Sequence, residues 1–199
     1  HNMDPIDFRL QNASKEDTRR ADGVVFPKIG NVEVLEAAKA SEHWKSDLGT
    51  PPKGRVRGRG VASGYWFNVG LKSAVSLTVN NDGSVALVEG STDIGGTRTS
   101  ISMQAAEVLG IGVENFIPTV GDTDTAGYAD VTGGSRTTYA TGFAAVKAAE
   151  NLIEVLKERC AIIWSLDKND IDFRDGTFYA SKDPELKFSF KDLASNLDN

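Results

Sequence analysis

The sequence has little cysteine, little histidine and no long hydrophobic run. Its 199 residues include one cysteine, Cys160, and two histidines. This inventory excludes an internal disulfide and the common zinc sites. No segment approaches the roughly 18 consecutive apolar residues that a membrane-spanning helix needs, and the polar N-terminal stretch has no apolar signal core. The sequence therefore predicts a cytoplasmic protein without a membrane span and without a metal site made of protein ligands.

Basic residues are outnumbered by acidic ones, 22 to 28, which gives a net charge of −6. This balance disfavours nucleic acid as a partner. Lys53, Arg55, Arg57 and Arg59 alternate along the chain and would share one side of an extended segment. This basic run has three interpretations: a solvated boundary segment or one that forms salt bridges, a contact with a subunit or a ligand phosphate, and a nucleic-acid contact, which is the weakest of the three.

Neither Cys160 nor His43 has the sequence context of a catalytic residue. Cys160 lies on the same predicted helical face as Ile153 and Leu156, so it is expected to be a buried apolar thiol. His43 lies beside a tryptophan in a polar stretch, without a carboxylate or thiol at the spacing of a triad or a metal site. The sequence therefore identifies no catalytic nucleophile or base.

The sequence pattern of the first 52 residues differs from that of the rest of the chain. Residues 1–52 alternate short polar helical patterns, at 4–15 and 32–45, with loop signals, and we interpret them as a helical lead-in segment. Asp4, which precedes a proline, is a typical N-cap. Residues 53–199 are interpreted as an α/β lobe.

The lobe is predicted to be an α+β fold. Two β-hairpins, around the Asn-Asp-Gly turn that ends at Gly83 and around Asp175-Gly176, are interleaved with helices at 99–109 and 138–164, and a further strand ends at Gly121. Strand pairs and helices in this order predict mixed α/β layers. The longer helix is expected to turn Phe143, Val146, Ile153, Leu156 and Ile163 inward.

A short motif occurs twice, each time where a loop leads into a helix. The first turn is Gly95-Gly96-Thr97-Arg98-Thr99, and the second turn is Gly133-Gly134-Ser135-Arg136-Thr137. Free amides at a helix N-terminus, glycines, a hydroxyl and an arginine together can hold an oxyanion. The alternative is that the hydroxyls cap the helices, the glycines supply turn geometry and each arginine pairs with a carboxylate. Neither turn is a Walker loop, because the lysine is absent.

Two other patterns lie near these turns. Asp122, Thr123 and Asp124 follow a predicted strand and form either a hydrogen-bonded turn or a loop that borders a ligand. They do not form an EF-hand, because an alanine and a glycine occupy ligand positions. The glycines of 58–64 approach the dinucleotide-binding pattern, but no apolar strand precedes them, so Rossmann-type binding is not supported.

Three ordered blocks carry a family resemblance: GRGVASGYWFNVG, STDIGGTRTSISMQAAEVLGI and VGDTDTAGYADVTGGSRTTYATGFAAVKAAENL. They resemble the molybdenum-cofactor-binding subunit of the xanthine dehydrogenase and aldehyde oxidase family. The opening MDPIDFRLQN is similar to the family segment that precedes this region. The resemblance covers most of the chain and is weakest after Trp164. It implies one lobe of a molybdenum-cofactor-binding domain.

The resemblance implies a cofactor and the residues that contact it. Family members bind molybdopterin, with or without an attached nucleotide, and its dithiolene holds the molybdenum, so the protein provides no metal ligand. Iron–sulfur centres and FAD belong to partner subunits or domains. An Arg136 that grips a cofactor phosphate is expected to face solvent without ligand, and the two turns are expected to face a common cleft. The residues that match the family's cofactor-binding positions are Gly95, Gly96, Thr97, Asp122, Thr123, Asp124, Gly134, Ser135, Arg136 and Thr137.

Two departures from the family pattern limit what this chain does alone. The family's Gly-Gln-Gly pattern corresponds here to DIGGT, which contains no glutamine and is one residue shorter. The surroundings of the metal are therefore expected to differ from those of other family members. The family's catalytic glutamate, from a GxGE-type segment, has no counterpart. We therefore expect a fragment of a larger subunit whose parent hydroxylates an aldehyde or an N-heterocycle with oxygen from water, and an inactive isolated chain. The alternative is a non-catalytic module that binds a phosphorylated ligand or a partner subunit.

Overall fold

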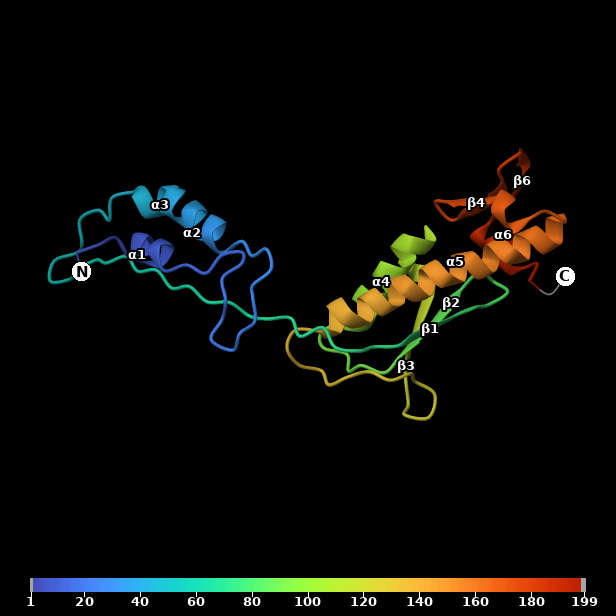
Figure 1. Ribbon diagram of the computed structural model, residues 1–199, viewed down its shortest axis with the longest axis horizontal. Helices are drawn as coiled ribbons and strands as arrows, with labels where there is room; N and C mark the ends of the chain where they lie inside the picture. Colours follow the sequence, from blue (N-terminus) through green and yellow to red (C-terminus); the bar gives the residue numbers. More distant parts are fainter. Residues whose placement is uncertain (1, 198–199) are drawn as a thin grey trace. The chain divides into compact units, whose positions relative to one another are not determined.

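The computed structural model describes residues 2–197 (Figure 1). The chain forms two compact units, which meet in sequence between Tyr65 and Trp66. The boundary expected from the sequence lies earlier, after residue 52.

The basic run belongs to the first unit because its arginines are bound there. Arg57 donates a hydrogen bond to the carbonyl of Leu48 (2.8 Å), and Arg59 donates to the carbonyls of Trp44 (2.6 Å) and Ser46 (2.9 Å). The acceptors are neutral carbonyls and not the carboxylates of salt bridges. These bonds hold the extended segment after residue 52 against the helices that precede it.

The first unit contains three short helices: α1 (Pro5–Gln11), α2 (Asn31–Ala40) and α3 (Glu42–Lys45). The expected N-cap at Asp4 is confirmed, since its Oδ1 accepts the amides of Ile6 and Asp7 at 2.7 and 3.1 Å. The Nε1 of Trp44 donates to the other oxygen of the same carboxylate (3.1 Å). Asp4 therefore begins α1 and also ties it to α3.

A three-stranded sheet forms the base of the second unit, with strand order β1-β2-β3. The predicted hairpin is confirmed: β1 (Val75–Val79) and β2 (Val85–Glu89) are antiparallel. The predicted strand that ends before Gly121 is β3 (Phe116–Val120), which lies parallel to β2. A parallel pair needs a crossover, and helix α4 (Thr97–Leu109), followed by the short turn η1 (Val113–Asn115), supplies it.

The long helix α5 (Gly142–Trp164) packs along α4 (Figure 1). It begins later than the sequence predicts, because a π-helical turn, η2 (Thr137–Thr141), precedes it. We call η2 the π turn. It places one wide turn between the second motif and the regular helix.

Phe143 was expected to face inward, and this prediction is wrong. Its side chain is 58% exposed, whereas Ala145 and Ala149 are fully buried. Because an α-helix turns about 100° per residue, Phe143 lies about 200° from Ala145 and so on the opposite face. Leu156 is buried as expected, and the remaining three residues of the predicted inward set are half-buried.

A second sheet closes the far end of α5. Its strands are β4 (Ile171–Arg174), β5 (Thr177–Ala180) and β6 (Asp183–Ser189), all antiparallel, and β4 follows the short turn η3 (Lys168–Asp170). The predicted hairpin at Asp175-Gly176 is confirmed. Sequence reasoning missed β6 and the helix α6 (Phe190–Ala194), which Ser189 and Asp192 begin with a capping box.

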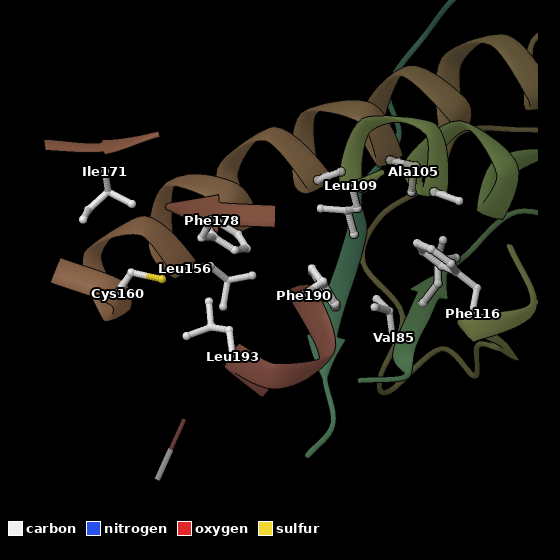
Figure 2. Close-up of a cluster of buried hydrophobic side chains, with 14 of the residues drawn as sticks. Val85, Ala105, Leu109, Phe116, Leu156, Cys160, Ile171, Phe178, Phe190 and Leu193 are labelled. Atoms are coloured by element: carbon white, nitrogen blue, oxygen red, sulfur yellow. The ribbon is translucent and has the colours of Figure 1, made fainter. Parts of the chain in front are cut away.

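One core joins both sheets and the two long helices (Figure 2). Val85 and Phe116 enter it from the first sheet, and Phe178 enters it from the second. Cys160, fully buried, contributes from α5. The mixed α/β layers expected from the sequence are thus confirmed, and α4 and α5 are the layer that connects the sheets.

Cys160 provides a direct test of this core. Burial raises the pKa of its thiol to about 12, and the thiolate is the form that reacts with alkylating agents. We expect iodoacetamide at pH 8 to leave Cys160 unmodified in the folded protein and to modify it fully in denaturant, as followed by intact mass. Rapid alkylation of the folded protein would contradict the core described here.

Candidate functional site

Two loop segments, 68–74 and 128–135, pair beside the start of β1, and we call them the loop ladder. Ser73 and Ala129 form an antiparallel bridge. The amide of Asp130 donates to the carbonyl of Lys72 at 3.0 Å, and the amide of Lys72 donates back to the Asp130 carboxylate at 2.8 Å. The Tyr128 hydroxyl, the Lys72 amide and the nearby charge of Arg136 lower the pKa of Asp130. The ladder is therefore anchored through its polar groups.

Arg136 holds the ladder to the entrance of α5. Its guanidinium donates to the carbonyls of Gly70 (2.7 Å), Lys72 (2.8 Å) and Asp130 (2.9 Å) and to the hydroxyl of Ser73 (2.5 Å). The residue is 0% exposed, which corrects the expectation that Arg136 faces solvent. All four of its hydrogen bonds go to the protein's own oxygens, and none of its surface is exposed.

The second turn presents backbone amides ahead of the π turn. Gly134 and Ser135 both have left-handed backbones, with φ of 61° and 56°. A Cβ on Gly134 would lie 2.5 Å from a methyl of Val69, so glycine is required there both for conformation and for space. Neither the π turn nor α5 has a side-chain cap. The helix entrance expected at this motif is confirmed, and it lacks the capping expected under the alternative interpretation.

Thr137 carries an unsatisfied hydroxyl at this entrance. The residue is 3% exposed, and its Oγ1 has no hydrogen-bond partner among residues 2–197. The neighbouring Thr141 is equally buried, but its hydroxyl shares a 2.9 Å hydrogen bond with Ser73. A buried hydroxyl without a partner costs free energy, and it is the donor or acceptor that a bound ligand would satisfy.

The first turn is already occupied by a carboxylate of the chain itself. Oδ1 of Asp93 accepts the amides of Gly96 (3.0 Å) and Thr97 (2.8 Å) and the hydroxyl of Thr97 (3.0 Å). The Thr97 hydroxyl, followed by these amides, lowers the pKa of Asp93. Gly95 and Gly96 are left-handed, so the glycine part of the capping interpretation holds here. The N-terminus of α4 thus carries its own anion.

The arginine of the first turn pairs inward as well. Arg98 donates to the carboxylate of Glu89 at 2.9 Å and to the carbonyls of Ser91 (3.0 Å) and Thr119 (3.1 Å). The side chain of Glu89 has no exposed surface, and that of Arg98 has 13%. This is the carboxylate pairing that the alternative interpretation expected. It fixes the ends of β2 and β3 to the first turn.

The loop after β3 also closes on itself. Oδ1 of Asp122 accepts the amides of Asp124 and Thr125, each at 2.9 Å, and the Thr125 hydroxyl at 3.0 Å. These bonds lower the pKa of Asp122, and the bond from the Thr125 hydroxyl has the largest effect. Thr123 and Asp124 are exposed. The structure therefore shows the hydrogen-bonded turn that was one of the two interpretations of this motif.

Helix α4 contacts the π turn. Gln104 of α4 donates from its side-chain amide to the carbonyl of Thr138 in the π turn (3.2 Å). Sequence reasoning missed Gln104 and Asp93. An aspartate three residues before a glycine that begins a helix is a capping signal, so Asp93 could have been found. Gln104 gives no such signal, because its partner is distant in sequence.

Comparison with known families decides what this arrangement belongs to. A model described as a molybdopterin cofactor-binding domain matches residues 32–198. The chain belongs to this family. The resemblance found in the sequence is thereby confirmed, together with the cofactor class that the family binds.

Known relatives support this family assignment. The molybdenum-binding subunit PaoC of an aldehyde oxidoreductase is 30% identical in Escherichia coli O157:H7, over 188 residues and 87% of this chain, and also 30% identical in strain K12. The chain spans 24% of the length of these relatives. Among solved structures, CO dehydrogenase from Oligotropha carboxidovorans matches 63% of this chain and 16% of its own, with a TM-score of 0.58 and 27% identity.

A more distant structure has the same fold. Quinoline 2-oxidoreductase from Pseudomonas putida 86 matches 62% of this chain and 16% of its own, with a TM-score of 0.51 and 19% identity. Within residues 2–197, no helix is long and apolar enough to cross a membrane. In the same range, no three His, Cys, Asp or Glu side chains are grouped to hold a metal ion.

The ion pair at the first turn predicts a large energetic effect. Arg98→Ala leaves the carboxylate of Glu89 buried without a counter-charge, so we expect a loss of about 3–5 kcal/mol in the free energy of unfolding. Lys147→Ala, which removes the exposed partner of Glu150, is the control and should cost less than about 1 kcal/mol. Urea unfolding followed by circular dichroism compares the two; equal losses would refute the burial argument.

Proposed function

We propose that this chain is one part of the molybdenum-binding subunit of a molybdenum hydroxylase and that the second turn binds an anionic group of molybdopterin. The observation that carries this proposal is the buried hydroxyl of Thr137 beside a buried cation. Among the described residues, no carboxylate lies within ion-pair distance of Arg136. A phosphate bound by the amides at the α5 entrance would lie close to this cation and stabilise its charge without contacting it.

The two turns differ in their fit to an anion. The amides of Gly96 and Thr97 are already bonded to Asp93, whose negative charge repels a phosphate. The second turn has no internal anion, and Ser135 is exposed. We therefore assign the anion to Gly134, Ser135 and Thr137. The first turn and the loop at Asp122 to Asp124 are proposed to border the same cleft without holding the phosphate.

Molybdenum, carried by the pterin dithiolene, would supply the redox chemistry when the cofactor is bound. The residues of this chain bind and orient the pterin. Arg136 stabilises the second turn from its buried side, through the loop ladder. The exposed Ser135 and the buried Thr137 provide hydrogen bonds to the cofactor. The proposed parent reaction is hydroxylation of an aldehyde or an N-heterocycle in the cytoplasm. The remainder of the subunit and iron–sulfur and flavin partners would complete the enzyme.

Cofactor content tests this proposal. The gene product that carries this chain is purified from a host that makes molybdopterin, and molybdenum and pterin are measured per protein by elemental analysis and by fluorescence of the oxidised pterin. We expect both in equal amounts. A well-folded product that lacks both would support the alternative, a non-catalytic module for a phosphorylated ligand or a partner subunit.

The isolated chain is expected to be catalytically inactive. It contains no glutamate in the family's base context, and loss of a general base commonly lowers the rate by about 10²–10⁴. The assay is dye reduction by the purified 199-residue chain with aldehydes and purines as substrates. Turnover by this chain without molybdenum would show that the reaction assignment is wrong.

Thr137→Val separates binding from stability. Removing an unsatisfied buried hydroxyl should raise the free energy of unfolding by about 1 kcal/mol, while cofactor retention falls. Thr141→Val is the matched control: it removes a satisfied hydroxyl and should lower stability by about 1 kcal/mol. Thermal unfolding and pterin content are measured for both variants. A destabilised Thr137→Val with full cofactor content would make this hydroxyl purely structural.

A further inference from the structure

We infer that Arg136 is a positioning residue for the anion site: it sets the direction in which the second turn presents its amides, without touching the anion. This inference rests on the proposed function and deepens it. It concerns an arginine whose four hydrogen bonds all go to the protein's own oxygens.

The carbonyls of the second turn point toward the loop ladder. The amide of Val69 donates to the carbonyl of Gly134 at 3.1 Å, and the side-chain amide of Asn68 donates to the carbonyl of Ser135 at 2.8 Å. In a trans peptide the C=O and the following N–H point in opposite directions. The amides of Ser135 and Arg136 therefore point away from segment 68–69.

These two amides are available for a ligand. Within the described part of the chain, neither donates a hydrogen bond to another residue. They are consecutive, and the left-handed backbone of Ser135 is followed by the right-handed backbone of Arg136. Successive amides of this kind form a concave anion-binding nest.

Arg136 controls these directions through the ladder. Its guanidinium fixes the carbonyls of Gly70 and Lys72, and Gly70 directly follows Val69. Through Ser73 the same network reaches Thr141 in the π turn. Without the guanidinium, segment 68–73 loses three hydrogen bonds and keeps those that Asn68 and Val69 donate. The carbonyls of Gly134 and Ser135 are then held in a less rigid frame, and their orientation is less fixed. The amides then bind an anion more weakly.

Pyrophosphate binding to the whole chain tests this inference. The amide resonances of Ser135 and Arg136 are followed by ¹H–¹⁵N NMR while sodium pyrophosphate is added at constant ionic strength. We expect saturable shifts in the natural sequence and a dissociation constant at least tenfold higher in Arg136→Ala. Guanidinium ion at low millimolar concentration should restore part of the affinity in the variant and leave the natural sequence unchanged.

Arg98→Ala is the matched control, because it removes the arginine at the same position of the first turn. It should destabilise the fold yet change the dissociation constant for pyrophosphate by less than twofold. Where Arg136→Ala does not fold, Asn68→Ala replaces it: this exposed side chain orients the Ser135 carbonyl directly, and its loss should weaken binding several-fold.

The outcomes separate the two proposals. If the natural sequence shows no saturable shift, the anion site itself is wrong, and the inference falls with it. If the natural sequence binds pyrophosphate and Arg136→Ala or Asn68→Ala binds it equally well, the anion site stands and the positioning role is overturned. A weakened Arg136→Ala that guanidinium ion does not restore would also overturn that role.

Discussion

The second unit depends on one buried cation. The guanidinium of Arg136 ties the segment before β1, more than sixty residues earlier in the chain, to the loop after β3 and the entrance of α5. A fully buried arginine is tolerated only where its donors are satisfied, and here backbone carbonyls satisfy them. The site is therefore built on loop backbone that one side chain holds in place, rather than on strand ends alone.

Sequence reasoning predicted the regular elements that have local signals. The first hairpin, the turn at Asp175-Gly176 and the stop of α4 at Gly110 follow from turn residues and periodicity. It missed β6 and α6, because the burial of Phe190 and Leu193 depends on packing against α5 and the first sheet. It also misplaced Phe143, since the apolar residues of α5 cover more than the one face that the core uses.

The candidate site was predictable in composition but not in the division of roles. Both motifs carry two glycines, a hydroxyl and an arginine, and both stand at helix entrances. The sequence does not show that Asp93 fills the first entrance or that Arg136 turns away from the second. Such roles depend on which oxygens come within reach, and for Arg136 three of the four belong to residues more than sixty positions earlier in the chain.

The π turn at Thr137–Thr141 holds one residue more than a regular helical turn would. A deletion within it would restore α-helical geometry and rotate everything upstream by about 100° relative to the buried face of α5. A relative whose α5 begins without this extra residue would therefore align one position out of register with this chain. The error would fall at the second turn, where the shared motif suggests that the residues are equivalent. During evolution, the gain or loss of one codon in the π turn can therefore change the direction of the loop that precedes it and leave the hydrophobic core intact.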